Sequence, residues 1–143
     1  MAVSPLQAQL KQTRVIQLML LMTIILFGIF VYALQPTNAL SKGMNAGIIA
    51  TAAIAVVVTF NLRGKFLAPA ESALHGDPTN FAAVKRWRKW TITSLIVGYA
   101  VGMLGFALAM YGARRVEFLV FFLVSVALLL LWTPRLDLPP DSR

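Results

Sequence analysis

The residues best suited to acid–base or metal chemistry lie in one short stretch near the middle of the chain. Glu71, His75 and Asp77 fall within seven positions, and His75 is the only histidine. Glu71 and His75 are four positions apart and would share one face of a helix. An imidazole can act as a base near neutral pH or bind a metal ion. Zinc usually takes four ligands, and the chain offers no cysteine. We therefore expect no metal, no cofactor and no catalytic residue here.

The same stretch continues into KRWRKW at 85–90, which mixes cations with tryptophans. Arginine and aromatic side chains together can stack on nucleic-acid bases. This motif, however, directly precedes a long apolar run, where tryptophans anchor a helix at the membrane surface and cations face anionic lipid headgroups. We therefore predict no nucleic-acid partner, and we predict a lipid-interface role for these residues: Lys85, Arg86, Trp87, Arg88, Lys89, Trp90 and Trp132.

The composition points to a membrane protein. Of the 143 residues, 59% are hydrophobic and only 13% are charged, whereas soluble domains average about 25% charged residues. Four uncharged runs cover 15–41, 43–62, 90–113 and 118–134, and a membrane-spanning helix needs about 17–25 apolar residues. We predict a single all-α transmembrane domain over 1–143, with helices near 15–34, 44–62, 90–111 and 116–133.

The remaining segments are predicted to connect or flank these helices. The first apolar run is too long for a cleaved signal sequence, in which about 7–15 apolar residues are usual. We predict a loop over 63–89, with a turn near Pro69, because proline disrupts a helix interior. Gly76 suits a helix end, and Asp77 suits an N-cap with Pro78 at the first helical position. The tail 134–143 should be extended.

The distribution of cations predicts the orientation. If the chain crosses the membrane four times, as two antiparallel hairpins, 10 of its 13 Lys and Arg residues lie on the side of the two termini and the central loop. Cytoplasmic segments carry an excess of Lys and Arg. We therefore predict an inner-membrane protein with both termini and the loop 63–89 in the cytoplasm.

A seam of small residues marks the third predicted span. It consists of residues spaced 4, 3, 4 and 3 apart: Gly98, Gly102, Gly105, Ala109 and Gly112. Such spacing keeps one stripe facing a partner helix, and small residues let helix backbones approach closely in lipid. The second span is also rich in small residues. We therefore predict that spans two and three form the tightly packed centre, while spans one and four face more lipid.

Apart from Glu117 in the first turn of the fourth span, no Asp, Glu, Lys, Arg or His lies within the predicted spans, although such a residue is the usual mark of a transport pathway. Small multidrug exporters have four spans but use a glutamate in the first, which this chain lacks. The third span is similar to the carboxylate-bearing helix of rotary-ATPase ring subunits, but Tyr99 stands where the acid would be. We therefore expect a non-catalytic accessory or assembly subunit, whose partners are the lipid bilayer, anionic headgroups, and other membrane subunits or a second copy.

Two alternatives stay open. A small oligomeric transporter or channel would use Tyr99, Thr51 and Asn45 as its polar lining. An enzyme acting on lipid would use His75 and Asp77. As a whole, the chain resembles small bacterial four-span membrane proteins of uncharacterised function, which have a basic start, two hairpins and a basic-aromatic segment before a glycine-rich third helix. The resemblance implies the four-span fold and no particular activity.

Overall fold

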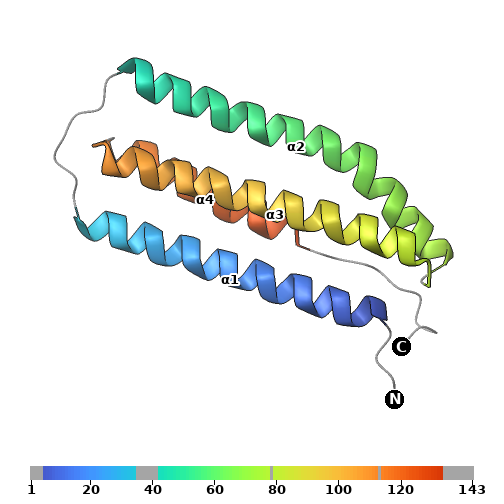
Figure 1. Cartoon of the computed structure of the whole chain (residues 1–143). Coiled ribbons are helices and arrows are strands. Elements are labelled where there is room, and N and C mark those ends of the chain that lie inside the picture. The colour runs from blue at the N-terminus through green and yellow to red at the C-terminus, as the bar shows by residue number, and fades with distance from the viewer. Residues whose placement is uncertain (1–4, 35–41, 78, 113, 134–143) are drawn as a thin grey trace.

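The computed structural model describes residues 5–34, 42–77, 79–112 and 114–133, and the descriptions below concern these residues. This part of the chain is helical apart from short turns, as Figure 1 shows. The all-α prediction is therefore confirmed. The extended tail that we predicted at 134–143, and Pro78, lie outside the described residues. The helices are α1 (Pro5–Leu34), α2 (Lys42–Gly76), α3 (Phe81–Met110) and α4 (Arg115–Leu131).

Three of these helices are long and apolar enough to cross a membrane. The candidate spans are Gln7–Ala33, Ala46–Gly76 and Phe81–Met110. The fourth helix has only 17 residues, which is the lower end of the range for a membrane-spanning helix. The predicted membrane character is thus supported by three helices, while α4 is at the limit.

The third helix is the centre of the bundle. It packs against α1, α2 and α4, whereas α2 packs along α3 and otherwise contacts only Trp132, at the end of α4, through Phe60 and Arg63 among the described ring contacts. Accordingly, 44% of the most apolar segment of α3 is buried, against 11% for α2. Within the described residues α1 and α2 do not approach each other, because α3 lies between them in Figure 1. Spans two and three do pack on each other, but the prediction that span two belongs to the tight centre is wrong, because α2 is the most peripheral helix and α4 packs most extensively on α3.

The glycines of α3 face α4 and α1. A methyl group added at Gly102 would lie 2.5 Å from Ile24 Cδ1 and 2.7 Å from Ser125 Oγ, and one at Gly105 would lie 2.6 Å from Phe121 Cβ. Gly98 faces Leu128 and Leu129. The bulky side chains of α4 thus fill the space that the glycines leave. Sequence spacing identified the stripe but not its partner. Because the glycines pack on α4, α4 is less exposed than we predicted.

The last two positions of the predicted seam differ from each other. Ala109 is fully buried in the bundle core. Gly112 lies beyond the end of α3, with φ 85°, and its N–H donates to the carbonyl of Ala109 at 3.1 Å. This left-handed backbone conformation favours glycine and commonly follows a helix end. Gly112 therefore ends α3, and its assignment to helix packing is wrong.

The second helix does not turn at Pro69. It continues for 35 residues, through Pro69 to Gly76, and it bends toward its C-terminal end in Figure 1. Proline lacks an N–H and crowds the carbonyl four residues earlier, which bends a helix without always ending it. At 1.5 Å per residue α2 is about 52 Å long. The predicted end at Gly76 is confirmed.

The turn between α2 and α3 is shorter than predicted. Asn80, not Asp77, is the N-cap of α3, and its side chain accepts a hydrogen bond from Ala83 N at 3.1 Å. Asp77 Oδ1 instead accepts from the backbone N–H of Thr79 at 2.9 Å and from its hydroxyl at 2.6 Å. Asp77 therefore shapes the turn and does not start the helix.

Most of the predicted loop 63–89 is helical. Residues 63–76 of α2 and the first turns of α3, from Phe81 onward, form a helical extension of the bundle. Figure 1 shows that α4 ends well before the corresponding ends of the other three helices. The extension has its own buried cluster, on which Leu10 of α1 also packs. The members of the cluster are Leu67, Ala70, Leu74, Ala83, Val84 and Trp87.

Candidate functional site

The three candidate ligands Glu71, His75 and Asp77 do not converge. His75 Nδ1 lies 2.7 Å from the backbone carbonyl oxygen of Glu71, and the His75 side chain is exposed. The hydroxyl and then the backbone N–H of Thr79 stabilise the Asp77 carboxylate, which lowers its pKa. Within the described residues, no three His, Asp or Glu side chains are grouped so as to hold a metal ion. The His75 and Asp77 side chains thus make local contacts at the end of α2, and Glu71 contributes its backbone carbonyl.

The predicted lipid-interface residues divide into two groups. Lys85, Arg86 and Lys89 are exposed. Trp87 and Trp132 are each only 1% exposed, so the prediction that they face lipid headgroups is wrong for both. The continuation of α2 past Pro69 covers Trp87, and α2 also covers Trp132 through Phe60.

The other two residues of the motif make specific contacts. The Trp90 ring is half-buried and stacks on Phe66, with 4.6 Å between ring centroids and 4° between planes. Arg88 Nη2 donates to Gln12 Oε1 at 3.2 Å, which joins α3 to α1. Half of the basic-aromatic motif is therefore part of the packing between helices.

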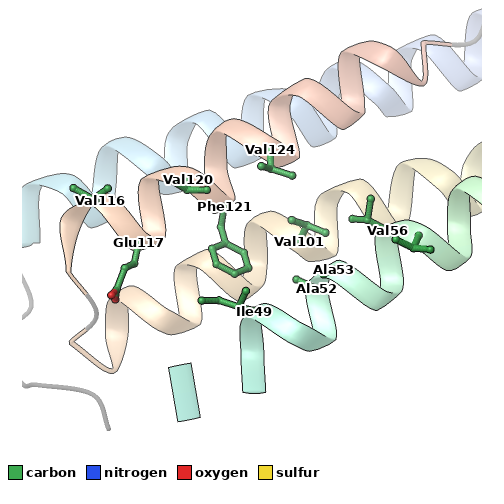
Figure 2. Close-up of a pocket in the computed structure, with 11 residues that line it drawn as sticks. Ile49, Ala52, Ala53, Val56, Val101, Val116, Glu117, Val120, Phe121 and Val124 are labelled. Atoms are coloured by element: carbon green, nitrogen blue, oxygen red, sulfur yellow. The ribbon is translucent and has the colours of Figure 1, made fainter. Parts of the chain in front are cut away.

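A groove of about 550 Å³ lies between α2 and α4, with α3 at its floor (Figure 2). Its lining is apolar except for Glu117 near the N-terminal end of α4. Glu117 Oε2 accepts from the backbone N–H of Arg114 at 3.2 Å, so this carboxylate also caps α4. We call this feature the α2–α4 groove, and its lining includes Ile49, Ala53, Val56, Val57, Val120 and Val124.

The polar residues expected to line a transport path are not part of this groove. The hydroxyl of Thr51 is exposed and donates to the carbonyl of Gly47 in its own helix, at 2.9 Å. Tyr99 is partly buried against the core of the bundle. The side chain of Asn45 lies outside the described part. Neither Thr51 nor Tyr99 therefore gives the groove a polar surface.

A layer of polar contacts lies at the level where α4 ends. Gln17 Nε2 of α1 donates to the carbonyl of Leu129 at 2.6 Å and to Thr133 Oγ1 at 2.9 Å. Carbonyls in the last turn of a helix have no partner within that helix, so Gln17 supplies one and fixes the end of α4 against α1.

Beside this layer, Arg63 and Trp132 form a cluster with Phe60. The guanidinium carbon of Arg63 lies 5.9 Å from the Trp132 ring centroid, and Phe60 meets Trp132 edge-on at 5.4 Å. Arg63 Nη1 and Trp132 Nε1 are both buried without a hydrogen-bond partner. We call these three residues the Arg63 cluster. From the sequence, Arg63 was counted only among the cations that predict the membrane orientation. Its position directly after an apolar run could have indicated that its side chain packs against the bundle.

The side of α2 that faces away from the bundle carries a second regular stripe. Its members are spaced 4, 3, 4 and 3 apart and all are exposed: Gly47, Thr51, Ile54, Val58 and Asn61. The Asn61 amide donates to the carbonyl of Val57 in the same helix at 2.9 Å. We call this the outer stripe of α2. Its spacing was visible in the sequence, but its exposure follows from the position of α2 at the edge of the bundle.

Comparison with other proteins gives no further assignment. No family model matches the chain, and neither a curated protein nor a solved structure matches it.

Proposed function

We propose that this chain is an inner-membrane protein that crosses the bilayer four times, as two antiparallel hairpins, with both termini and the helical extension in the cytoplasm. The excess of Lys and Arg on that side supports this orientation. The length of α2 also supports it, because about 52 Å exceeds the apolar core of about 30 Å and leaves its C-terminal turns in water. The fourth crossing is α4, whose 17 residues are just sufficient.

Within this topology, the protein acts as a non-catalytic accessory or assembly subunit that packs against a transmembrane helix of another polypeptide. The observation that carries this proposal is the outer stripe of α2. Its spacing keeps one line of residues facing a partner helix that supercoils with α2, and Gly47 and Thr51 would let the two backbones approach closely. A methyl group added at Gly47 would meet nothing within 4 Å, so this side of the helix is open.

Two further observations support a packing role over chemistry. The described candidates for acid–base chemistry make separate local contacts, and the α2–α4 groove is apolar. A transporter would need polar side chains along a path, whereas Thr51 is bonded within its own helix and Tyr99 packs on the core. We therefore favour the subunit over the transporter or channel.

Photo-cross-linking in the native membrane tests this proposal. A photoreactive phenylalanine analogue at Ile54, which is 63% exposed, should form an adduct with a second polypeptide, and the adduct mass distinguishes a copy of this chain from another protein. The matched control is the same analogue at Leu123 on α4, which is 69% exposed. Adducts at Ile54 and not at Leu123 support the proposal. Equal yields at both positions, or none at Ile54, would contradict it.

A further inference from the structure

The α2–α4 groove leads toward the Arg63 cluster. Along α2, the lining residues Ile49, Ala53 and Val57 are followed by Phe60 and then Arg63. Along α4, Val120 and Val124 precede Trp132, whose ring contacts Phe60. The Arg63 cluster does not itself line the groove, but it lies about one helical turn beyond the last lining residue of α2 and about two turns beyond that of α4.

The Arg63 cluster contains hydrogen-bond donors without acceptors. Arg63 Nη1 and Trp132 Nε1 are buried and unpaired, although buried N–H groups almost always have a partner. Both are donors only, so the missing partner must be an acceptor. Arg63 also carries a positive charge, for which a phosphate is a well-suited acceptor.

The shape of the groove distinguishes among occupants. The edge-on contact between Phe60 and Trp132, at 5.4 Å, closes the cytoplasmic end to an object as wide as a helix. An acyl chain is much narrower. From Arg63 to Ala53 is ten residues, about 15 Å along the helix, which matches half of an apolar core of about 30 Å. A headgroup at Arg63 would therefore place its acyl chain in the cytoplasmic leaflet, beside the groove lining.

We propose that the α2–α4 groove binds one anionic phospholipid, with an acyl chain along the groove and its phosphate bound by the accessible part of the Arg63 side chain. Arg63 is only partly buried, so a headgroup can approach it from the lipid side. Basic pockets between membrane helices on the cytoplasmic side commonly hold anionic headgroups. This inference rests on the proposed topology but not on the outer stripe, which lies on another side of α2.

Native mass spectrometry of the detergent-purified protein, titrated with dioleoyl phosphatidylglycerol, tests the inference. We expect one tightly bound lipid per chain, and binding at least five-fold weaker in Arg63→Gln. Lys65→Gln removes an exposed cation two residues away and should leave the affinity unchanged. Ala53→Phe, which fills the groove from its lining, should weaken binding while leaving Arg63 unchanged.

The remaining outcomes each contradict the inference. Equal loss in Lys65→Gln would show a diffuse charge effect in place of a site. Binding of dioleoyl phosphatidylcholine as tight as that of phosphatidylglycerol would exclude recognition of the headgroup charge. If inorganic phosphate alone displaced the lipid, and Ala53→Phe bound the lipid as tightly as the unaltered protein, the site would be one for a free anion. The cross-linking at Ile54 is unaffected by these variants, so failure here is distinguishable from failure of the proposed function.

Discussion

At the scale of single residues, two glycines of α3 allow close contact with neighbouring helices. At Gly102 the nearest atom to an added methyl is the flexible end of Ile24, whereas at Gly105 it is Phe121 Cβ, which is fixed close to the α4 backbone. Gly105 therefore has less freedom to accept a side chain. The periodic spacing predicted this stripe, but the partner depends on the α4 side chains, and no local pattern encodes which helix they meet.

We predict that Gly105→Ala destabilises the bundle by about 1–3 kcal/mol, the usual cost of forcing extra atoms into a packed core. Reversible unfolding in detergent would measure this change. Gly64→Ala is the matched control, because a methyl group there meets nothing within 4 Å. It should stabilise α2 by about 1 kcal/mol, since alanine favours a helix more than glycine does. Equal effects of the two substitutions would show that α3 and α4 are not in this close contact.

Trp87 and Trp132 show where residue-type reasoning fails. Tryptophan beside cations at the end of an apolar run is typical of a membrane interface, and Trp90, which is partly exposed, is compatible with that role. The rings of Trp87 and Trp132 are covered by α2. The burial of Trp87 depends on how far α2 extends, which the presence of Pro69 concealed, whereas that of Trp132 depends on the packing of Phe60 and Arg63 against the end of α4.

At the scale of elements, the helical extension is the largest difference from prediction. Pro69 and a cluster of charges suggested a loop, but Leu67, Ala70 and Leu74 recur at helical spacing and pack on Val84 and Trp87 of α3. The free energy gained by burying these side chains offsets the free-energy cost of one proline in the helix. The helical spacing was present in the sequence, whereas the packing that stabilises this part of α2 as a helix comes from its antiparallel neighbour α3.

We predict that Leu74→Ala weakens the helical extension by about 2–5 kcal/mol, as expected for truncating a fully buried leucine. The loss should be local, so hydrogen exchange should increase within 66–90 and stay unchanged at the core around Leu108. His75→Ala is the control, because its side chain is exposed, and we expect no change in exchange. A loop over 63–89 would instead exchange rapidly already in the unaltered protein.

At the scale of the whole molecule, composition and uncharged runs were enough to predict an all-α chain with long apolar helices. Five of the eight predicted helix ends lie within about two residues of the observed ones, but α1 and α3 begin 10 and 9 residues earlier than predicted and α2 ends 14 residues later. They did not predict the central position of α3, the α2–α4 groove or the Arg63 cluster. These features depend on contacts between residues far apart in the chain, and apolar helices in lipid offer few sequence signals that select one neighbour over another.

The central claim is that the chain crosses the membrane four times with its termini in the cytoplasm. Because the protein has no cysteine, single-cysteine variants Lys85→Cys, Arg115→Cys and Ser142→Cys can be labelled in intact cells with a membrane-impermeant maleimide. We predict labelling of Arg115→Cys alone, with the other two labelled only after lysis. Labelling of both Arg115→Cys and Ser142→Cys in intact cells would show that α4 does not cross the membrane. Labelling of Lys85→Cys and Ser142→Cys without Arg115→Cys would show that the orientation is reversed.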